Sequence, residues 1–249
     1  MKEMPCSLKL AYLLVVILFV LNIVSFVKIN KVDNSLNSKV ETWISNNPEN
    51  ILKSVSSYVS KQQEESQKKQ QAQAGENIDK YKEELRDTKY AGVINPSGTK
   101  EIVEFFDYNC GYCKMAHKNV NELLKNRKDV KVILRAIPIL GEPSVYATKV
   151  GEAILLTKPE AYVDYYNNVM DSSARNTEEV AQVVAKIGLK MSDIDKIMEK
   201  NKDQIEQAIK SNLDLAQKVG VNGTPAFIVN GNFFPGAVDA KTLEDSLEK

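Results

Sequence analysis

The sequence is poor in the residues that build metal centres and disulfide-rich scaffolds. Its 249 residues include 3 cysteines, 1 histidine and 1 tryptophan. Three cysteines cannot supply the several bridges that hold small secreted proteins together. One histidine adds too little to complete a structural zinc site, which takes four ligands. The chain must therefore fold around an ordinary apolar core, and 43% hydrophobic residues are enough to build one.

The sequence also lacks an excess of charge of either sign. Lysine and arginine together number 33, aspartate and glutamate also number 33, and the formal net charge is +0 at pH 7. Proteins that bind nucleic acids through the phosphate backbone carry a basic excess. We therefore expect no nucleic-acid partner.

One long apolar run stands near the start of the chain. Residues 10–27 read LAYLLVVILFVLNIVSFV, without a charge, and no small-residue cleavage site follows them. The run is just long enough to span a bilayer and longer than most signal-peptide cores. We expect residues 1–33 to be an uncleaved signal anchor, with a cleaved signal peptide as the alternative. Either segment would export the rest of the chain and leave Cys6 on the opposite side of the membrane.

A second region, residues 34–90, has a helical pattern that fades into polar sequence. Its apolar residues recur at helical spacing; they are Ile51, Leu52, Val55, Tyr58 and Val59. Residues 61–77 then contain no leucine, isoleucine, valine or aromatic residue. We expect a helical stalk whose apolar stripe packs against copies of itself, which predicts a homo-oligomer and allows a trimer.

The region 91–249 alternates strand and helix patterns. A strand is predicted at 102–106, a helix from residue 113 and a second strand at 130–137. Residues 144–220 are helical in pattern, and two strands flank the hairpin turn Asn230-Gly231. A last helix begins near residue 239. The order β-α-β, helical block, β-β-α predicts an α/β thioredoxin fold with an inserted helical domain at about 144–220.

Two cysteines stand between the first strand and its helix, as Cys110-Gly-Tyr-Cys113. A structural bridge here would close a very small loop and constrain little of the unfolded chain. A redox couple fits better. The helix N-terminus favours a thiolate at Cys110, while Cys113 lies one turn further on the apolar face. We expect Cys110 to be the more exposed thiol and the nucleophile, and Cys113 to be the resolving thiol. His117 is expected to be an exposed helix residue.

Two further features accompany the cysteines. Glu104 interrupts the apolar strand IVEFF, where a carboxylate is costly unless it has a partner or a task. It either relays protons for Cys113 or lies at a strand edge facing water. The dipeptide Thr224-Pro225 precedes the strand AFIV. A cis bond there can present the Thr224 backbone to an extended substrate.

Three segments together, VEFFDYNCGYCK, IPILGEPSV and GVNGTPAFIVNG, resemble the DsbA-like thiol-disulfide oxidoreductases. The most similar subgroup is that of the suppressor-of-copper-sensitivity protein C and related trimeric DsbA-like proteins. The resemblance implies a periplasmic protein with a thioredoxin fold. It also implies a set of site residues: catalytic Cys110, Cys113 and Glu104, and substrate-binding Thr224 and Pro225.

The dipeptide between the cysteines departs from the family's strong oxidants. It is Gly111-Tyr112 where those proteins have Pro-His. We therefore expect that the reduction potential of the Cys110–Cys113 pair is not extremely oxidising.

The expected function is that of an enzyme that forms or isomerises disulfide bonds in exported proteins. The redox-active disulfide Cys110–Cys113 would serve without a metal or another cofactor. The expected partners are exported cysteine-containing proteins and a membrane redox protein that recycles the site. Two alternatives stay open: a copper(I)-handling thiol protein of the periplasm, and a non-catalytic interaction protein with a thioredoxin fold.

Overall fold

The computed structural model describes residues 18, 21–22, 39–40, 42–172 and 176–248, and of residues 63–74 the backbone alone. Its contacts divide the chain into two units, Met1–Ser66 and Gln67–Lys249. The apolar run 10–27 lies almost wholly outside the described residues. Among the residues that are described, no helix is long and apolar enough to cross a membrane. The signal anchor thus stays a prediction.

The first unit contains most of the long helix α2 (Pro48–Lys80). The apolar stripe predicted from helical spacing does lie on this helix. Four of its side chains are between 45% and 68% exposed: Leu52, Val55, Tyr58 and Val59. Exposing these apolar side chains to water is unfavourable. We therefore expect another chain to cover them.

The end of α2 and the short helix α3 (Lys82–Arg86) belong to the second unit. Ile78 and Leu85 are each only 3% exposed and join a core cluster beneath the sheet. The boundary at residue 90 stays a prediction; the contacts themselves divide the chain between Ser66 and Gln67. Apolar residues resume at Ile78, and burying them ties this segment to the sheet.

A five-stranded mixed sheet forms the centre of the second unit, in the order β1-β3-β2-β4-β5. Strands β2 and β3 are parallel, and every other pair is antiparallel. The strands are β1 (Gly92–Ile94), β2 (Lys100–Phe106), β3 (Val130–Ala136), β4 (Ala226–Val229) and β5 (Asn232–Pro235). This confirms the thioredoxin-like α/β fold. Strand β1 was not predicted, because three residues are too few to show an alternating pattern.

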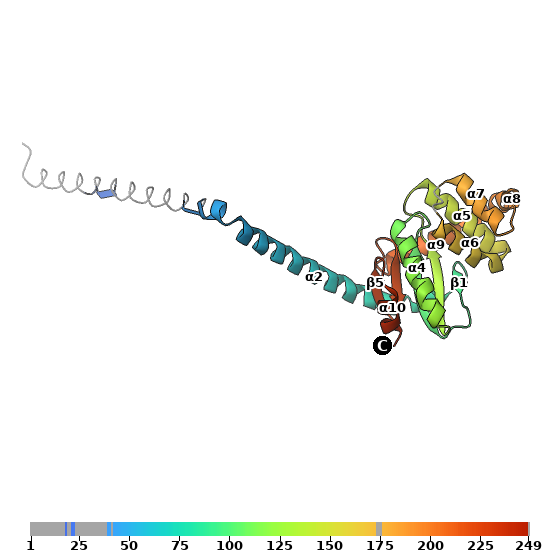
Figure 1. The fold of residues 1–249 in the computed structure, drawn as a ribbon, viewed down its shortest axis with the longest axis horizontal. Helices are drawn as coiled ribbons and strands as arrows, with labels where there is room; N and C mark the ends of the chain where they lie inside the picture. The colour runs from blue at the N-terminus through green and yellow to red at the C-terminus, as the bar shows by residue number, and fades with distance from the viewer. Residues whose placement is uncertain (1–17, 19–20, 23–38, 41, 173–175, 249) are drawn as a thin grey trace, which may run out of the picture. The chain divides into compact units, whose positions relative to one another are not determined.

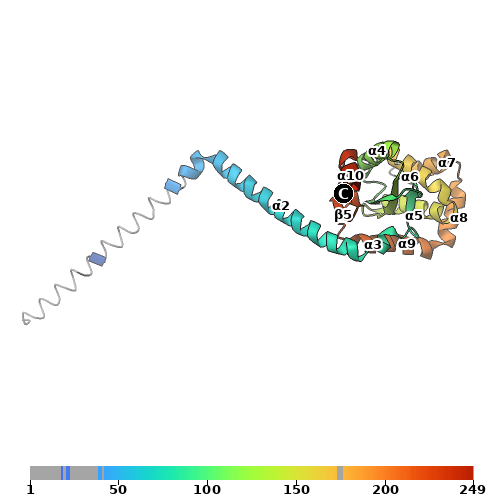
Figure 2. The same cartoon turned by 90° about the horizontal axis from the view of Figure 1, so that it is seen from below.

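Helices cover both faces of the sheet, as Figure 2 shows. Helices α4 (Gly111–Asn126) and α10 (Ala240–Leu247) lie on one face, and α3 and α9 (Lys202–Lys218) on the other. Alternate residues of a strand point to opposite faces. Along β2, Val103 and Phe105 join the core cluster that includes α9, while Ile102 and Phe106 join the one that includes α4. Glu104 therefore points to the α4 face.

The predicted helical insertion is present between β3 and β4 (Figure 1). It consists of α5 (Glu142–Thr157), η1 (Pro159–Ala161), α6 (Tyr162–Asp171), α7 (Thr177–Lys186), α8 (Met191–Lys200) and α9. Asn176 caps α7 as expected, because its side chain accepts a hydrogen bond from the Glu179 N–H at 2.9 Å. Four fully buried tyrosines join the insertion to the end of β2: Tyr108, Tyr162, Tyr165 and Tyr166.

The hairpin between β4 and β5 also follows the sequence signal. Asn230 and Gly231 have φ angles of 52° and 78°, the left-handed conformation that this turn requires.

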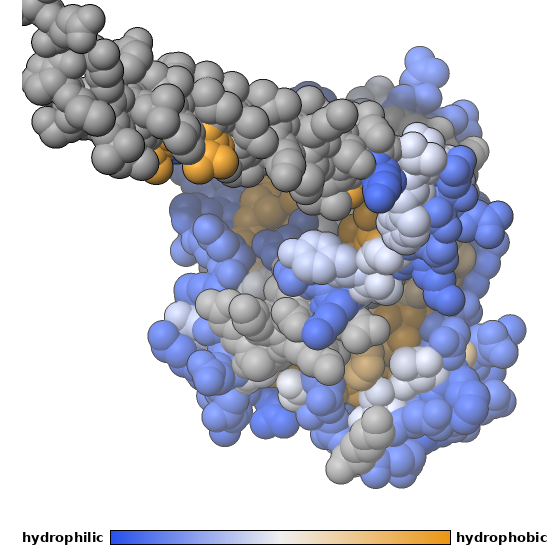
Figure 3. Space-filling model, turned by 90° about the vertical axis from the view of Figure 1, so that its left-hand side faces the viewer, coloured by the Kyte–Doolittle hydropathy of each residue, from blue (hydrophilic) through white to orange (hydrophobic). Residues whose placement is uncertain are grey.

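On the face drawn in Figure 3, hydrophilic side chains cover most of the coloured surface, and apolar side chains lie in the recesses between them.

Candidate active site

Cys110 is the N-cap residue of α4, directly after the loop that leaves β2. Its N–H donates to the Asp107 carbonyl at 3.1 Å, and its own carbonyl accepts from the Lys114 N–H at 3.1 Å. The first N–H groups of a helix have no partner within the helix, and they favour negative charge. The Cys110 sulfur thus lies at the N-terminus of α4.

Asp107 holds this loop in place, and sequence reasoning missed it. Its buried carboxylate accepts hydrogen bonds from the Asn109 N–H at 2.8 Å and the Ser144 hydroxyl at 2.7 Å. It also accepts from the N–H groups of Ile139 at 2.8 Å and Leu140 at 3.1 Å. One side chain thereby joins the cysteine loop, the segment after β3 and the start of α5. The available signal was an aspartate two residues before Asn109, a spacing typical of an Asx turn.

Cys113 lies one turn inside α4 and is fully buried. Burial raises the pKa of its thiol well above the usual range. Hydrogen bonds with the Asp107 backbone and the Thr224 side chain oppose that rise, whereas the nearby Cys110 and Glu104 add to it. Both cysteines are free thiols here, and Cys110 keeps 6% of its surface exposed. Both cysteines are therefore buried, but Cys110 is the more exposed of the two, since Cys113 has no exposed surface.

The Thr224–Pro225 segment faces the cysteines across the site, and its peptide bond is cis, as expected. The Cys110 thiol donates to the Thr224 carbonyl oxygen at 3.3 Å. A cavity of about 300 Å³ lies beside this segment, lined also by Phe233 and Gly236. This cavity borders the Thr224–Pro225 segment, and neither cysteine is among the residues that line it.

Glu104 is buried without any exposed surface, so the water-facing alternative is wrong. Its neighbours across the sheet are Leu134 and Phe227, both apolar. Burial raises the pKa of its carboxyl to about 8, and the hydrogen bond that the Tyr166 hydroxyl donates at 3.2 Å works against that rise. Glu104 is therefore a neutral acid at neutral pH, close to Cys113.

The expectation that His117 is exposed is also wrong. Its side chain is buried beneath α6, because the inserted helix covers this face of α4. Its Nε2 lies 3.3 Å from an Asp171 carboxylate oxygen and 3.0 Å from the Asn121 amide nitrogen. Within the described part of the chain, no group of three histidine, cysteine, aspartate or glutamate residues is placed to hold a metal ion.

Exposed apolar side chains border Cys110. Tyr112 and Met115 project from the first turns of α4. Ile139 and Leu140 are also exposed, and the Asp107 carboxylate holds their backbone beside the cysteine loop. Such a border can contact an unfolded chain without selecting one sequence.

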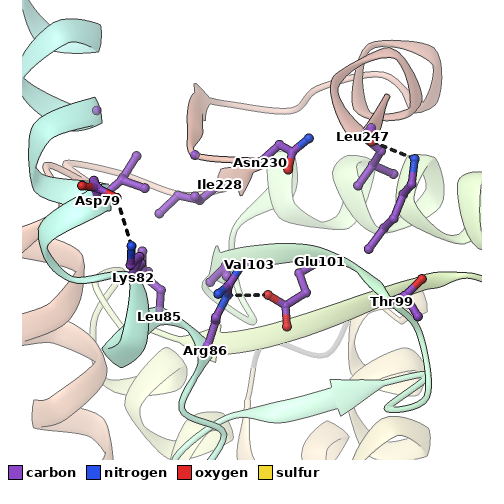
Figure 4. A pocket seen from close by; sticks show the side chains of 14 residues that line it. Asp79, Lys82, Leu85, Arg86, Thr99, Glu101, Val103, Ile228, Asn230 and Leu247 are labelled. Atoms are coloured by element: carbon purple, nitrogen blue, oxygen red, sulfur yellow. Dashed lines mark hydrogen bonds and ion pairs between the residues drawn. The ribbon is translucent and has the colours of Figure 1, made fainter. Parts of the chain in front are cut away.

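A larger cavity, of about 470 Å³, lies away from the cysteines (Figure 4). The end of α2, the helix α3, the start of β2 and the β4–β5 hairpin line it. Its polar groups pair with one another: Arg86 with Glu101 at 2.8 Å, and Lys82 with Asp79 at 3.5 Å. It includes none of the five predicted site residues.

The model of the DSBA-like thioredoxin domain matches residues 101–248, more than half of the chain. The chain belongs to this family. The match begins in β2 and ends one residue after α10, so it includes the cysteines, the inserted helices and the cis-proline segment of this DsbA-like domain.

Similar proteins agree with that assignment. The probable disulfide bond formation protein D of Bacillus anthracis is 26% identical over 161 residues, which are 60% of this chain and 74% of that protein. The thiol-disulfide exchange protein alpha-DsbA2 of Wolbachia pipientis is 29% identical, with a TM-score of 0.65, over 70% of this chain and 94% of that one. Proteus mirabilis ScsC in a transitional conformation is similar in fold, at 22% identity and a TM-score of 0.62, over 87% of this chain and 95% of that one.

Alkylation of the reduced protein should modify Cys110 long before Cys113. Cys110 lies at the helix N-terminus within reach of solvent, whereas Cys113 is fully buried and burial raises the pKa of its thiol. Limited reaction with iodoacetamide at several pH values, followed by peptide mapping, measures the order. Earlier modification of Cys113 would reverse the two assignments.

Replacing Glu104 with glutamine should weaken the pH dependence of stability. The carboxyl pKa is about 8 in the fold against an ordinary 4.5, so the folded state holds this proton more tightly. The stability that Glu104 contributes is thus complete below pH 4.5 and is lost as the pH rises through 8. The unchanged protein should lose on the order of a few kcal/mol of unfolding free energy between these two pH values, and the Glu104→Gln protein should not.

Urea unfolding of the reduced protein at about pH 5 and pH 9 measures this difference. Glu122→Gln, at an exposed position of α4, is the matched control and should behave as the unchanged protein does. An equal pH dependence in all three proteins would contradict the account of Glu104.

Proposed function

We propose that this protein is a thiol-disulfide oxidoreductase that exchanges disulfides with the cysteines of exported proteins through Cys110 and Cys113. The contact between the Cys110 sulfur and the Thr224 carbonyl, at 3.3 Å, carries this proposal. It places an attackable sulfur beside a backbone segment that can pair with an extended chain. Family membership supports the same chemistry.

The oxidising reaction begins when a client thiolate attacks Cys110 in the Cys110–Cys113 disulfide. The bond between the two sulfurs breaks, and its electron pair passes to Cys113. Attack falls on Cys110 because Cys113 has no exposed surface. The product is a mixed disulfide between the client and Cys110.

The leaving Cys113 sulfur needs a proton, because burial disfavours its thiolate. Glu104 is a suitable donor, since its carboxyl pKa of about 8 keeps it protonated at neutral pH. A second client thiolate then attacks the client sulfur of the mixed disulfide and releases Cys110. Two electrons pass from the client to the enzyme, and a membrane redox partner must remove them before the next cycle.

Client recognition rests on the Thr224–Pro225 segment and the apolar border. Thr224 is partly exposed, and the cavity beside it can take part of an extended chain. The exposed side chains of Tyr112, Ile139 and Leu140 add contacts with apolar residues that folded proteins bury. Clients are thus exported proteins that have not finished folding.

The stalk makes the proposed enzyme an oligomer and favours isomerisation over simple oxidation. The exposed stripe on α2 supplies a surface at which copies can join. Several active sites joined together raise the effective concentration of thiols around one misfolded client. With residues 1–33 as an export signal or anchor, the protein works in the periplasm.

Copper(I) handling is the alternative that uses the same two thiols. Titration of the reduced protein with copper(I), next to turnover with a disulfide client, separates the two functions. Tight copper binding without disulfide exchange would contradict the proposed enzyme and support the alternative.

Removing Cys113 should trap the proposed intermediate. Cys113→Ala leaves a Cys110 that can form a mixed disulfide but has no resolving thiol, so client adducts accumulate. In a soluble protein that begins near residue 34 and so lacks Cys6, Cys110→Ala should form none, because the Cys113 sulfur has no exposed surface. Non-reducing electrophoresis with a disulfide-containing unfolded client measures the adducts, and equal trapping by both variants would contradict the assigned roles.

Charges in the α2 stripe should separate the copies. In a soluble protein that begins near residue 34, Leu52→Asp with Val55→Asp should convert an oligomer to a monomer by placing carboxylates in the joined surface. Point variants are preferable to truncation near Ile78, which is buried in the core. The monomer should lose isomerisation of a scrambled client and keep oxidation of a dithiol.

Light scattering and the two activity assays measure these outcomes. Ser57→Asp adds a charge on the opposite side of the same helix and is the matched control, which should stay oligomeric. A monomeric parent protein, or a monomeric variant that isomerises equally well, would contradict the role of the stalk.

A further inference from the structure

The cavity beside Thr224–Pro225 lies on the face of the sheet that α9 covers, opposite the cysteines. Of the side chains that line it, Ala226 belongs to the core cluster that includes residues of α9, and Phe233 packs against that cluster. The two cysteines belong to the cluster on the other face, with other residues of α4. The Thr224–Pro225 segment thus has the cysteines on one side and the cavity on the other.

The lining of this cavity suits an apolar group. The described residues that line it carry no charge. Pro225, Pro235 and the partly exposed ring of Phe233 supply apolar surface, and Asn222 and Thr224 add an amide and a hydroxyl. Burying an ionised side chain against such a lining is costly, whereas burying an apolar one is favourable. An aromatic side chain gains most, because it can pack against the Phe233 ring.

Gly223 keeps the cavity open, although neither its conformation nor its packing requires a glycine. Its φ angle is not in the left-handed region, and a Cβ added there would meet no heavy atom within 4 Å. Gly220 and Gly236 differ, because their φ angles of 81° and 82° favour glycine whatever surrounds them. The volume of about 300 Å³ is at the lower end of the range for ligand pockets, which suits one large side chain.

Pairing with the Thr224 backbone would direct the side chains of a client to both faces of the sheet. The Thr224 side chain points to the cysteine face, where its hydroxyl makes a hydrogen bond with Cys113. Residues directly opposite each other in an antiparallel pair have their side chains on the same face, so a client cysteine opposite Thr224 points towards Cys110. Successive residues of an extended chain point to opposite faces. The residues on either side of the client cysteine therefore point to the face with the cavity.

We propose that this cavity is a subsite for a residue next to the client cysteine, and that it takes an uncharged, apolar and preferably aromatic side chain. The inference rests on the proposed function and deepens it, because it names a feature that the enzyme selects in its clients. Gly223 and Phe233 are then specificity-determining residues on the face of the sheet opposite Cys110.

Competition between two dithiol peptides tests the subsite. In each peptide the same residue flanks both cysteines on both sides, phenylalanine in one peptide and serine in the other. The disulfide form of the protein should oxidise the phenylalanine peptide about three- to ten-fold faster, as a ratio of second-order rate constants. Dividing by the ratio measured with oxidised glutathione alone removes the intrinsic difference between the peptide thiols. A corrected ratio near one would overturn the proposal.

Two variants change the cavity itself. Gly223→Leu should fill it and bring the corrected ratio close to one. Phe233→Ala removes the ring and should also lower the ratio, so the test stays informative if Gly223→Leu fails to fold. Gly75→Leu is the matched control and should keep the ratio of the unchanged protein, because a Cβ there also meets no heavy atom within 4 Å and the residue lies on α2, outside this cavity. A folded Gly223→Leu protein that slows both peptides by the same factor would contradict the subsite.

A measurement without turnover separates the subsite from the proposed function. Peptides with serine in place of each cysteine cannot react, but their flanking residues can still enter the cavity. The phenylalanine version should shift the amide nuclear magnetic resonance signals of Gly223 and Gly236 in the disulfide form, and the all-serine version should not. Shifts without oxidation of either dithiol peptide would count against the proposed function alone. Oxidation of both dithiol peptides without such shifts would overturn the subsite alone.

Discussion

The buried Asp107 carboxylate is the contact on which the rest of the site depends. It accepts four hydrogen bonds, from the cysteine loop, from the segment after β3 and from Ser144 on α5. Burying a carboxylate is costly unless hydrogen-bond donors surround it, and here each of its two oxygens accepts two hydrogen bonds. The same side chain thus places Cys110 at the start of α4 and presents Ile139 and Leu140 beside it.

The difference in burial gives the two sulfurs different roles. The alternation of β2 directs Glu104 to the face that α4 covers, where it meets the fully buried Cys113. Cys110 keeps its place at the helix N-terminus and touches the Thr224 carbonyl. Two sulfurs that differ in exposure, next to a neutral acid, suit a reversible exchange of disulfides.

Local signals in the sequence predicted much of this site, and contacts distant in the chain account for what they missed. The Cys110–Cys113 spacing, the Thr224-Pro225 pair and the Asn230-Gly231 turn each depend on a few neighbouring residues. His117 looked exposed because its burial comes from α6, a helix inserted about fifty residues later. The hydrogen-bond partners of Asp107 lie on α5 and after β3. Ile78 packs against the sheet, and the polar pattern of residues 61–77 gives no sign of this contact.

The reduction potential of the Cys110–Cys113 pair tests the central claim most directly. Equilibration of the protein with glutathione buffers, followed by alkylation and mass analysis, gives the fraction of disulfide at each ratio. The account predicts a reversible two-electron couple with a potential above about −300 mV, in the range of working disulfides. A potential below that value, as structural bridges have, or the absence of any disulfide between Cys110 and Cys113, would contradict it.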